Sequence, residues 1–276
     1  PVGDLRWKAP RELDSYPDTF KATTLPNRCM QVSNFYDSMD GIEGESIIGS
    51  EDCLYLNIYL SEKAYKSKKK LPVVFWIHGG GNTWGYSASN IFTSGDFILD
   101  HDVILVTTNY RLGPFGWFAY SGLNQDSENP LDSTANFGTL DIIKSLEWVN
   151  KYISFFNGDP ENITIFGESA GARNVISLMS SPLSKDLFQR GISQSGYLGS
   201  DSLEYSENNE RAGSLSLLKY LIKSENPNIA DEELSNFIGN KLLSKEFLRS
   251  ANANEIISYY RVRNDTGGLI DVPNVI

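Results

Sequence analysis

One serine in this chain stands in a setting that favours nucleophilic chemistry. The segment G-E-S-A-G at 167–171 follows the short apolar run 163–166 and precedes a helix-compatible stretch at 172–179. A strand, a Gly-x-Ser-x-Gly turn and a helix, in that order, are typical of a nucleophile elbow, which holds the serine hydroxyl exposed above the strand ends. Glycines on both sides of the turn leave room for neighbouring backbone. The sequence therefore predicts Ser169 as a catalytic nucleophile.

A second glycine cluster lies upstream of this serine. The apolar run 71–77 reads as a buried strand and leads into one histidine and three glycines at 78–81. Three successive glycines bury nothing and cost backbone entropy, so they favour a backbone that approaches a ligand closely. Acyl transfer needs N–H donors where the carbonyl oxygen becomes an oxyanion, each typically worth about 2.7–4 kcal/mol. We expect these donors to be the backbone N–H groups of Gly80, Gly81 and Ala170.

A serine nucleophile also needs a general base, and the two histidines of the chain are poor candidates. His78 precedes the glycine turn, where an imidazole more often orders the loop through hydrogen bonds. His101 comes just before the apolar strand 103–106, at the entry end of a strand, and is expected to be a surface loop residue. No histidine follows Ser169. A lone serine hydroxyl is a weak nucleophile at neutral pH, so these residues do not complete a triad.

Several further segments resemble the type-B carboxylesterases, a family that includes cholinesterases and related lipases. The segment E-D-C-L-Y-L-N at 51–57 matches a family signature residue for residue. Other matching segments follow the family order, at 1–7, 109–113, 136–149, 158–160 and 194–196. The similarity runs from residue 1 to about residue 200. It implies an α/β-hydrolase fold, with a central, mostly parallel sheet flanked by helices and a small antiparallel hairpin region near the N-terminus.

The resemblance also implies a triad of serine, acidic residue and histidine, in which the last two come well after the elbow. We therefore expect residues 1–276 to be the N-terminal part of one α/β-hydrolase catalytic domain, with about 201–276 as surface or cap helices. The remainder of the domain, with the acidic and histidine members, is expected outside this chain. This part alone is then expected to be inactive.

A disulfide is implied by the same resemblance. In the family, cysteines at the positions of Cys29 and Cys53 form a bridge that holds a loop over the active-site mouth. Closing about 24 residues stabilises a fold by about 3.5 kcal/mol in the chain-entropy model. A bridge would indicate an oxidising compartment, so a secreted or periplasmic protein. The alternative is a pair of buried, reduced thiols in a cytosolic protein.

Several residues depart from the family pattern. The family often has an aromatic residue after the glycines, where this chain has Asn82 and Thr83. Arg173 and Asn174 replace a small pair after the elbow. Arg173 would either anchor an acidic acyl group or, as the favoured alternative, make an ion pair within the fold. The loop between the cysteines lacks the tryptophan with which cholinesterases hold a quaternary ammonium, which argues against cholinesterase activity.

Hydrophobic periodicity predicts the remaining elements. Residues 54–60 alternate as a strand, and 72–77 is expected as its antiparallel neighbour, with the basic cluster 63–70 at the hairpin tip. Further strands are expected at 103–109 and 190–195, and helices at 142–153, 215–222 and 231–238. The resemblance implies two structural ion pairs, Arg6 with Glu51 and Arg111 with Asp141.

Composition restricts the function. A hydrophobic content of 40% supports a sizeable core. A net charge of −11 argues against nucleic-acid binding, and no apolar stretch approaches the length of a membrane span. We expect a serine carboxylic-ester hydrolase that forms an acyl-enzyme on Ser169, acts on a small-molecule ester and is completed by the C-terminal half of the same protein, without cofactor or metal. The alternative is a catalytically silent binding or adhesion protein on the same fold, which is less favoured because the serine and the glycine loop are intact.

Overall fold

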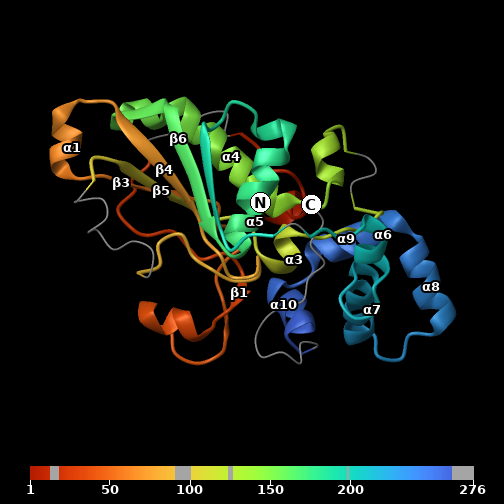
Figure 1. The fold of residues 1–276 in the computed structure, drawn as a ribbon. Helices are drawn as coiled ribbons and strands as arrows, with labels where there is room; N and C mark the ends of the chain where they lie inside the picture. The colour runs from red at the N-terminus through yellow and green to blue at the C-terminus, as the bar shows by residue number, and fades with distance from the viewer. Residues whose placement is uncertain (13–18, 91–100, 124–126, 198, 263–276) are drawn as a thin grey trace.

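The centre of the structure is a five-stranded sheet with strand order β3-β5-β4-β6-β7 (Figure 1). The structure is a computed structural model and describes residues 1–12, 19–90, 101–123, 127–197 and 199–262. β4, β5, β6 and β7 pair in parallel, and β3 pairs antiparallel with β5. The strands are β3 Leu56–Tyr59, β4 Leu71–Ile77, β5 Ile104–Thr108, β6 Gly158–Glu168 and β7 Arg190–Gln194.

Two helices cover one face of this sheet, α4 Phe137–Tyr152 and α5 Ala170–Ser180 (Figure 1). Alternate side chains of β4, from Val73 to Ile77, are fully buried in the main hydrophobic cluster, as are Ile142 and Leu146 of α4. The helical spacing that predicts an amphipathic helix at 142–153 is therefore confirmed, except that the last residue begins a short 3-10 turn.

The second part of the chain is helical and lies beside the sheet (Figure 1). The helices predicted at 215–222 and 231–238 are confirmed, and residues 263–276 of the expected cap region lie outside the described residues. Arg6 joins this part to the N-terminal segment, because its guanidinium donates to the carbonyl oxygens of Leu248 and Ala251 at 3.1 and 2.6 Å. The helices are α6 Leu203–Asn208, α7 Ser214–Glu225, α8 Asp231–Gly239, α9 Lys241–Ser250 and α10 Ala253–Val262.

The remaining elements are short. β1 and β2 form the small antiparallel element expected near the N-terminus. Among the described residues, no helix is both long and apolar enough to cross a membrane. The short elements are η1 Gly3–Leu5, β1 Gln31–Val32, η2 Phe35–Asp40, β2 Ile47–Ile48, α1 Glu62–Ser67, α3 Gly113–Gly116, η3 Pro130–Ser133, η4 Ile153–Phe156 and η5 Pro182–Ser184.

The predicted hairpin of 54–60 with 72–77 is wrong. β5 lies between the two strands, since Val106 pairs antiparallel with Ile58 and in parallel with Phe75. The connection is not a hairpin tip but helix α1, which Ser61 caps by accepting a hydrogen bond from the N–H of Ala64 at 3.1 Å. Alternation along a strand reports which face is buried and says nothing about which strand is its partner.

Both predicted ion pairs are confirmed. Arg6 contacts the carboxylate of Glu51 through Nε at 2.7 Å and Nη2 at 2.5 Å. Arg111 contacts both oxygens of Asp141 at 2.7 Å, and its backbone N–H donates to the same carboxylate at 3.0 Å. The Arg111 pair is buried and fixes the segment after β5 to helix α4, which makes it a structural pair.

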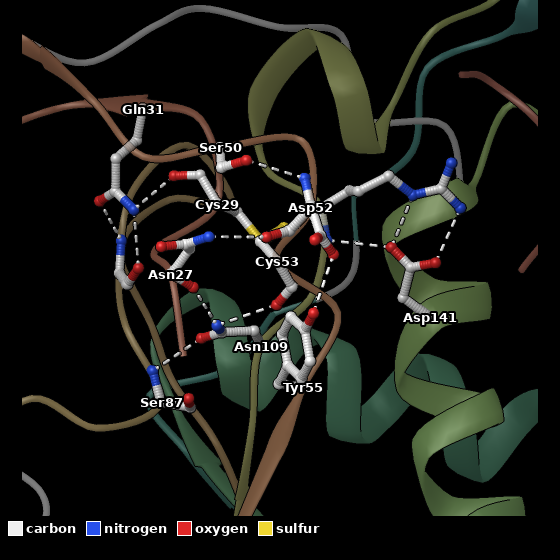
Figure 2. The surroundings of a disulfide bond; sticks show 12 residues. Asn27, Cys29, Gln31, Ser50, Asp52, Cys53, Tyr55, Ser87, Asn109 and Asp141 are labelled. Carbon is white, nitrogen blue, oxygen red and sulfur yellow. Dashed lines mark hydrogen bonds and ion pairs between the residues drawn. A yellow bond between two sulfur atoms is a disulfide. The ribbon is translucent and has the colours of Figure 1, made fainter. Parts of the chain in front are cut away.

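The disulfide between Cys29 and Cys53 is also confirmed, and it closes a sequence separation of 24 residues. Figure 2 shows the side chain of Asn109, just past the end of β5, beside this bridge. Its amide donates to the carbonyl oxygens of Asn27 and Cys53 at 2.9 and 3.0 Å, and its Oδ1 accepts from the N–H of Ser87 at 2.9 Å. One buried side chain therefore holds three loops at the end of the sheet.

The buried ion pair leads to a first prediction. Asp141→Ala leaves the Arg111 guanidinium buried without its carboxylate, so the free energy of unfolding should fall by about 3–5 kcal/mol in urea titrations. The double variant Arg111→Met/Asp141→Leu should recover most of this loss. Glu147→Ala on the same helix breaks only a partly exposed pair with Lys144 and should cost less than about 1 kcal/mol. Equal losses for Asp141→Ala and Glu147→Ala would contradict a structural role for the pair.

Candidate active site

The two glycine motifs meet because their strands are neighbours in the sheet. Ile77, the last residue of β4, pairs with Gly167 near the end of β6. Each strand then runs directly into its motif at the same carboxyl edge. Ligand sites of open α/β sheets lie at this edge.

Ser169 has the backbone conformation of a sharp turn, with φ 55° and ψ −119°. Residues other than glycine rarely adopt such a conformation, and it persists only where the surroundings enforce it. The Ser169 N–H donates to the carbonyl oxygen of Gln194 at 2.9 Å, and its own carbonyl accepts from the N–H of Arg173 at 3.0 Å. Ala170 is the first residue of α5, where N–H groups have no acceptor within the helix. The expected strand, turn and helix are all present.

There is no room for a side chain between the two motifs. A Cβ on Gly79 would lie 3.3 Å from the Cβ of Ser169, which places the glycine turn directly beside the serine. A Cβ on Gly171 would lie 2.1 Å from the carbonyl oxygen of Ile77, and one on Gly167 would lie 2.8 Å from the same atom. The glycines on both sides of the serine are therefore required by the backbone of β4.

The turn after β4 keeps successive residues in the left-handed region, with φ of 98° at Gly80, 62° at Gly81 and 60° at Asn82. The carbonyl oxygen of Gly80 closes the turn by accepting from the N–H groups of Thr83 and Trp84 at 2.9 and 3.1 Å. Within the described part of the chain, the N–H groups of Gly80 and Gly81 donate to no internal acceptor. The conformation thus leaves two consecutive amide donors unused beside the elbow.

His78 is a buried residue that orders the glycine turn. It is 1% exposed, its ring stacks on Tyr110 with centroids 4.4 Å apart, and Nδ1 donates to the carbonyl oxygen of Gly79 at 2.9 Å. Burial lowers the pKa of His78 from 6.5 to about 4, so the ring is neutral at physiological pH. A Cβ on Gly85 would lie 2.1 Å from Nδ1, so the ring is closely enclosed on that side too. The predicted loop-ordering role is confirmed.

His101 lies far from the elbow along the sheet. It is exposed and precedes β5, which runs parallel to β4. His101, three residues before the start of β5, is consequently at the amino edge of the sheet, whereas Ser169 is at the carboxyl edge. The predicted surface position of His101 is confirmed.

The disulfide loop reaches the glycine turn through Gln31, which the sequence did not single out, and through its aromatic residues. The amide of Gln31 donates to the carbonyl oxygen of Gly85 at 2.9 Å and accepts from the N–H of the same residue at 2.9 Å (Figure 2). Tyr36 stacks on Trp84 with centroids 5.3 Å apart, and Phe35 beside it is 80% exposed. The loop therefore adds an aromatic surface next to the turn. A glutamine within a polar loop gives no sequence signal for such a contact.

Arg173 does not form the expected ion pair with any described residue. Its guanidinium lies over the ring of Tyr197, 4.5 Å from the centroid, and Nη2 donates to the carbonyl oxygen of Gly199 at 3.1 Å. The reason is its position on α5, from which the side chain extends to the segment after β7. There it contacts the ring of Tyr197 and the carbonyl oxygen of Gly199.

Comparison with known proteins fits this geometry. The profile of the carboxylesterase family matches residues 1–272. The chain belongs to the carboxylesterase family. It is 39% identical over 196 residues to para-nitrobenzyl esterase of Bacillus subtilis (strain 168), covering 71% of this chain and 38% of that protein. It is 33% identical over 268 residues to fumonisin B1 esterase of Sphingopyxis macrogoltabida, covering 95% of this chain and 46% of that protein.

The fold of this chain is likewise shared with a solved structure. A solved PNB esterase structure superposes with a TM-score of 0.75 at 28% sequence identity, covering 99% of this chain and 51% of that one. The predicted family and α/β-hydrolase fold are therefore confirmed. The chain spans about half of the length of these structures and less than half of the length of these curated relatives.

The close contact between the motifs predicts that a methyl group added at Gly79 lowers the stability of the fold. Gly79→Ala places a Cβ 2.7 Å from the carbonyl oxygen of Glu168, so the turn and the elbow must move apart. The free energy of unfolding should fall by about 1–3 kcal/mol in urea titrations. Gly239→Ala, at the end of α8 with no atom within 4 Å of the added Cβ, should be neutral or stabilising by less than about 1 kcal/mol. Identical effects of the two substitutions would contradict the contact.

The buried His78 predicts a loss of stability in acid. Because its pKa falls from 6.5 to about 4 on folding, the unfolded chain binds a proton more readily between these values. The free energy of unfolding should therefore decrease as pH falls through this window, by up to about 3 kcal/mol. His78→Gln should show a shallower dependence when urea midpoints are measured between about pH 7 and pH 4. The same slope in both proteins would contradict this account.

Proposed function

We propose that this chain carries the nucleophile part of a serine carboxylic-ester hydrolase that forms an acyl-enzyme on Ser169. The observation that carries the proposal is the strained backbone of Ser169 at the junction of β6 and α5, packed against the glycine turn. Strain of this kind is concentrated at functional sites. Membership of the carboxylesterase family supports ester hydrolysis and a small-molecule ester as substrate.

The proposed reaction proceeds in two steps. Ser169 Oγ attacks the ester carbonyl carbon and gives its proton to a histidine, while the carbonyl oxygen becomes an oxyanion. The N–H groups of Gly80, Gly81 and Ala170 hydrogen-bond to that oxygen. The tetrahedral intermediate collapses, the alcohol leaves with the proton from the histidine, and the acyl group stays on Ser169. Water then attacks the acyl-enzyme by the same route and releases the carboxylic acid.

The acidic and histidine members are proposed to come from the remainder of the same polypeptide, the C-terminal half of the domain. His78 is enclosed and neutral, and His101 lies at the other edge of the sheet, which leaves Ser169 without a base among the described residues. The outer strand β7 supports this proposal, since all five of its residues are exposed. Parallel strands are normally covered on both faces. Residues 1–276 alone are then proposed to be inactive.

The disulfide supports a location in an oxidising compartment, so we propose a secreted or periplasmic protein. The bridge holds the aromatic loop next to the glycine turn, as described above. Both features suit a site that must stay rigid outside the cell.

Labelling with a fluorophosphonate tests the proposed function. In the complete protein the reagent should modify Ser169, located by peptide mass spectrometry, and Ser169→Ala should abolish labelling and lower kcat by about a million-fold. Ser224→Ala, on the exposed end of α7, should leave labelling and turnover unchanged. An unreactive Ser169 in a folded, complete protein would instead favour the silent binding protein.

A further inference from the structure

Two asparagines, one from each motif, meet in the interior behind the glycine turn. Asn82 follows Gly81, and Asn174 lies in the second turn of α5, five residues after Ser169. Asn174 Nδ2 donates to Asn82 Oδ1 at 3.0 Å, between side chains that are 3% and 4% exposed. The hydrogen bond joins the segment with the unused amide donors to the helix that begins at the nucleophile.

Asn82 is held on several sides. Its backbone lies in the left-handed region, which asparagine tolerates better than most residues. Its carbonyl oxygen accepts from the N–H of Gly113 at 2.7 Å. Tyr110 lies against the Asn82 side chain, with its hydroxyl 3.5 Å from Oδ1. The same hydroxyl donates to the carbonyl oxygen of His78 at 2.7 Å. Tyr110 therefore fixes the chain at His78, before the glycines, and Asn82 fixes it directly after them.

Asn174 is the main partner of the Asn82 side chain. Burial raises the pKa of the nearby Tyr110 hydroxyl, so this hydroxyl stays protonated. Removing the Asn174 amide would leave Asn82 Oδ1 with only the long contact to Tyr110. A buried polar atom without a partner costs about 1–3 kcal/mol, and the turn would relax to recover it. Such relaxation displaces the amides of the neighbouring glycines relative to Ser169.

Displacement of this kind acts on the transition state. Donors of an oxyanion hole contribute only when they lie at hydrogen-bonding distance from the developing oxyanion. An error of about 1 Å in a catalytic arrangement costs about a hundred-fold in rate. Substrate binding, by contrast, depends mainly on the pocket walls.

We propose that Asn82 and Asn174 form a pair of positioning residues that set the N–H groups of Gly80 and Gly81 against Ser169, and so control kcat rather than KM. The inference rests on the proposed function of Ser169. Neither residue touches the reacting atoms. Their contribution is to hold the glycine turn and helix α5 in a fixed relative position through a single side-chain hydrogen bond.

A double-mutant cycle in the complete protein tests the pair. Asn82→Gly keeps a residue that adopts positive φ, and Asn174→Ala removes the donor. Each single variant should lower kcat by about ten- to a hundred-fold with KM changed by less than about three-fold, and the double variant should lose no more than the worse single variant. Rates are expressed per active site titrated with the fluorophosphonate. The control variant Asn208→Ala, at an exposed position of α6, should have the kcat of the unaltered protein.

A second readout separates positioning from stability alone. A trifluoromethyl ketone binds serine hydrolases as a tetrahedral adduct with a charged oxygen, so its affinity should fall by the same factor as kcat. Asn174→Leu keeps the side-chain volume without the donor and should behave as Asn174→Ala; it replaces that variant if the smaller residue does not fold.

Two results would overturn the inference. In one, the variants melt at lower temperature while kcat per titrated site and inhibitor affinity stay unchanged. In the other, the losses of the single variants multiply in the double variant, which shows that the residues act independently. Failure of the proposed function looks different, because the unaltered protein would then show neither ester turnover nor labelling of Ser169.

Discussion

The carboxyl ends of β4 and β6 pack so closely that not even a methyl group fits between them. Gly79, Gly167 and Gly171 each face backbone atoms of the opposite motif. Parallel pairing brings Ile77 and Gly167 level, so the segments that follow emerge side by side. The strained Ser169 and the left-handed turn after Gly79 lie on the two sides of this one contact, where each backbone limits the conformations open to the other. The candidate active site is therefore a property of the sheet register as much as of its own residues.

A second layer of polar side chains keeps the loops around this contact in place. Asn109 binds three loops beside the disulfide (Figure 2). Arg111 joins the next segment to α4. His78 and Tyr110 stack behind the glycine turn. Among the described residues His78 Nε2 and Arg111 Nη1 have no hydrogen-bond partner, but the other polar side-chain atoms of these buried groups do, which makes the loops more rigid. Rigidity is what an arrangement of amide donors needs, because donors that are fixed in advance do not have to reorganise during the reaction.

Local pattern was enough to locate the elbow, the glycine turn and the main helices, because each is encoded within a few consecutive residues. Pairing between distant segments was harder to predict. Alternation in 54–60 identifies a strand, yet nothing in it indicates that β5 rather than β4 is its neighbour. The resemblance supplied Arg6 with Glu51, Arg111 with Asp141 and the disulfide, all long-range contacts. It could not supply the bond between Asn82 and Asn174, which are 92 residues apart and each stand out from the family pattern. Arg173 also departs from the family pattern, so the resemblance gave no partner for it. We expected an ion pair, and its guanidinium instead lies over the ring of Tyr197.

The amide of Gln31 replaces a peptide group, because it satisfies both the N–H and the carbonyl of Gly85 as a neighbouring strand would. The segment around the disulfide and the segment after the glycines are therefore joined as one structural unit. Transplanting the disulfide loop of a related protein into this chain would require both segments to be exchanged together. A transplanted loop with an apolar residue in place of Gln31 would leave the N–H and the carbonyl of Gly85 without these partners. The glycine turn would then be disturbed although all of its own residues were unchanged.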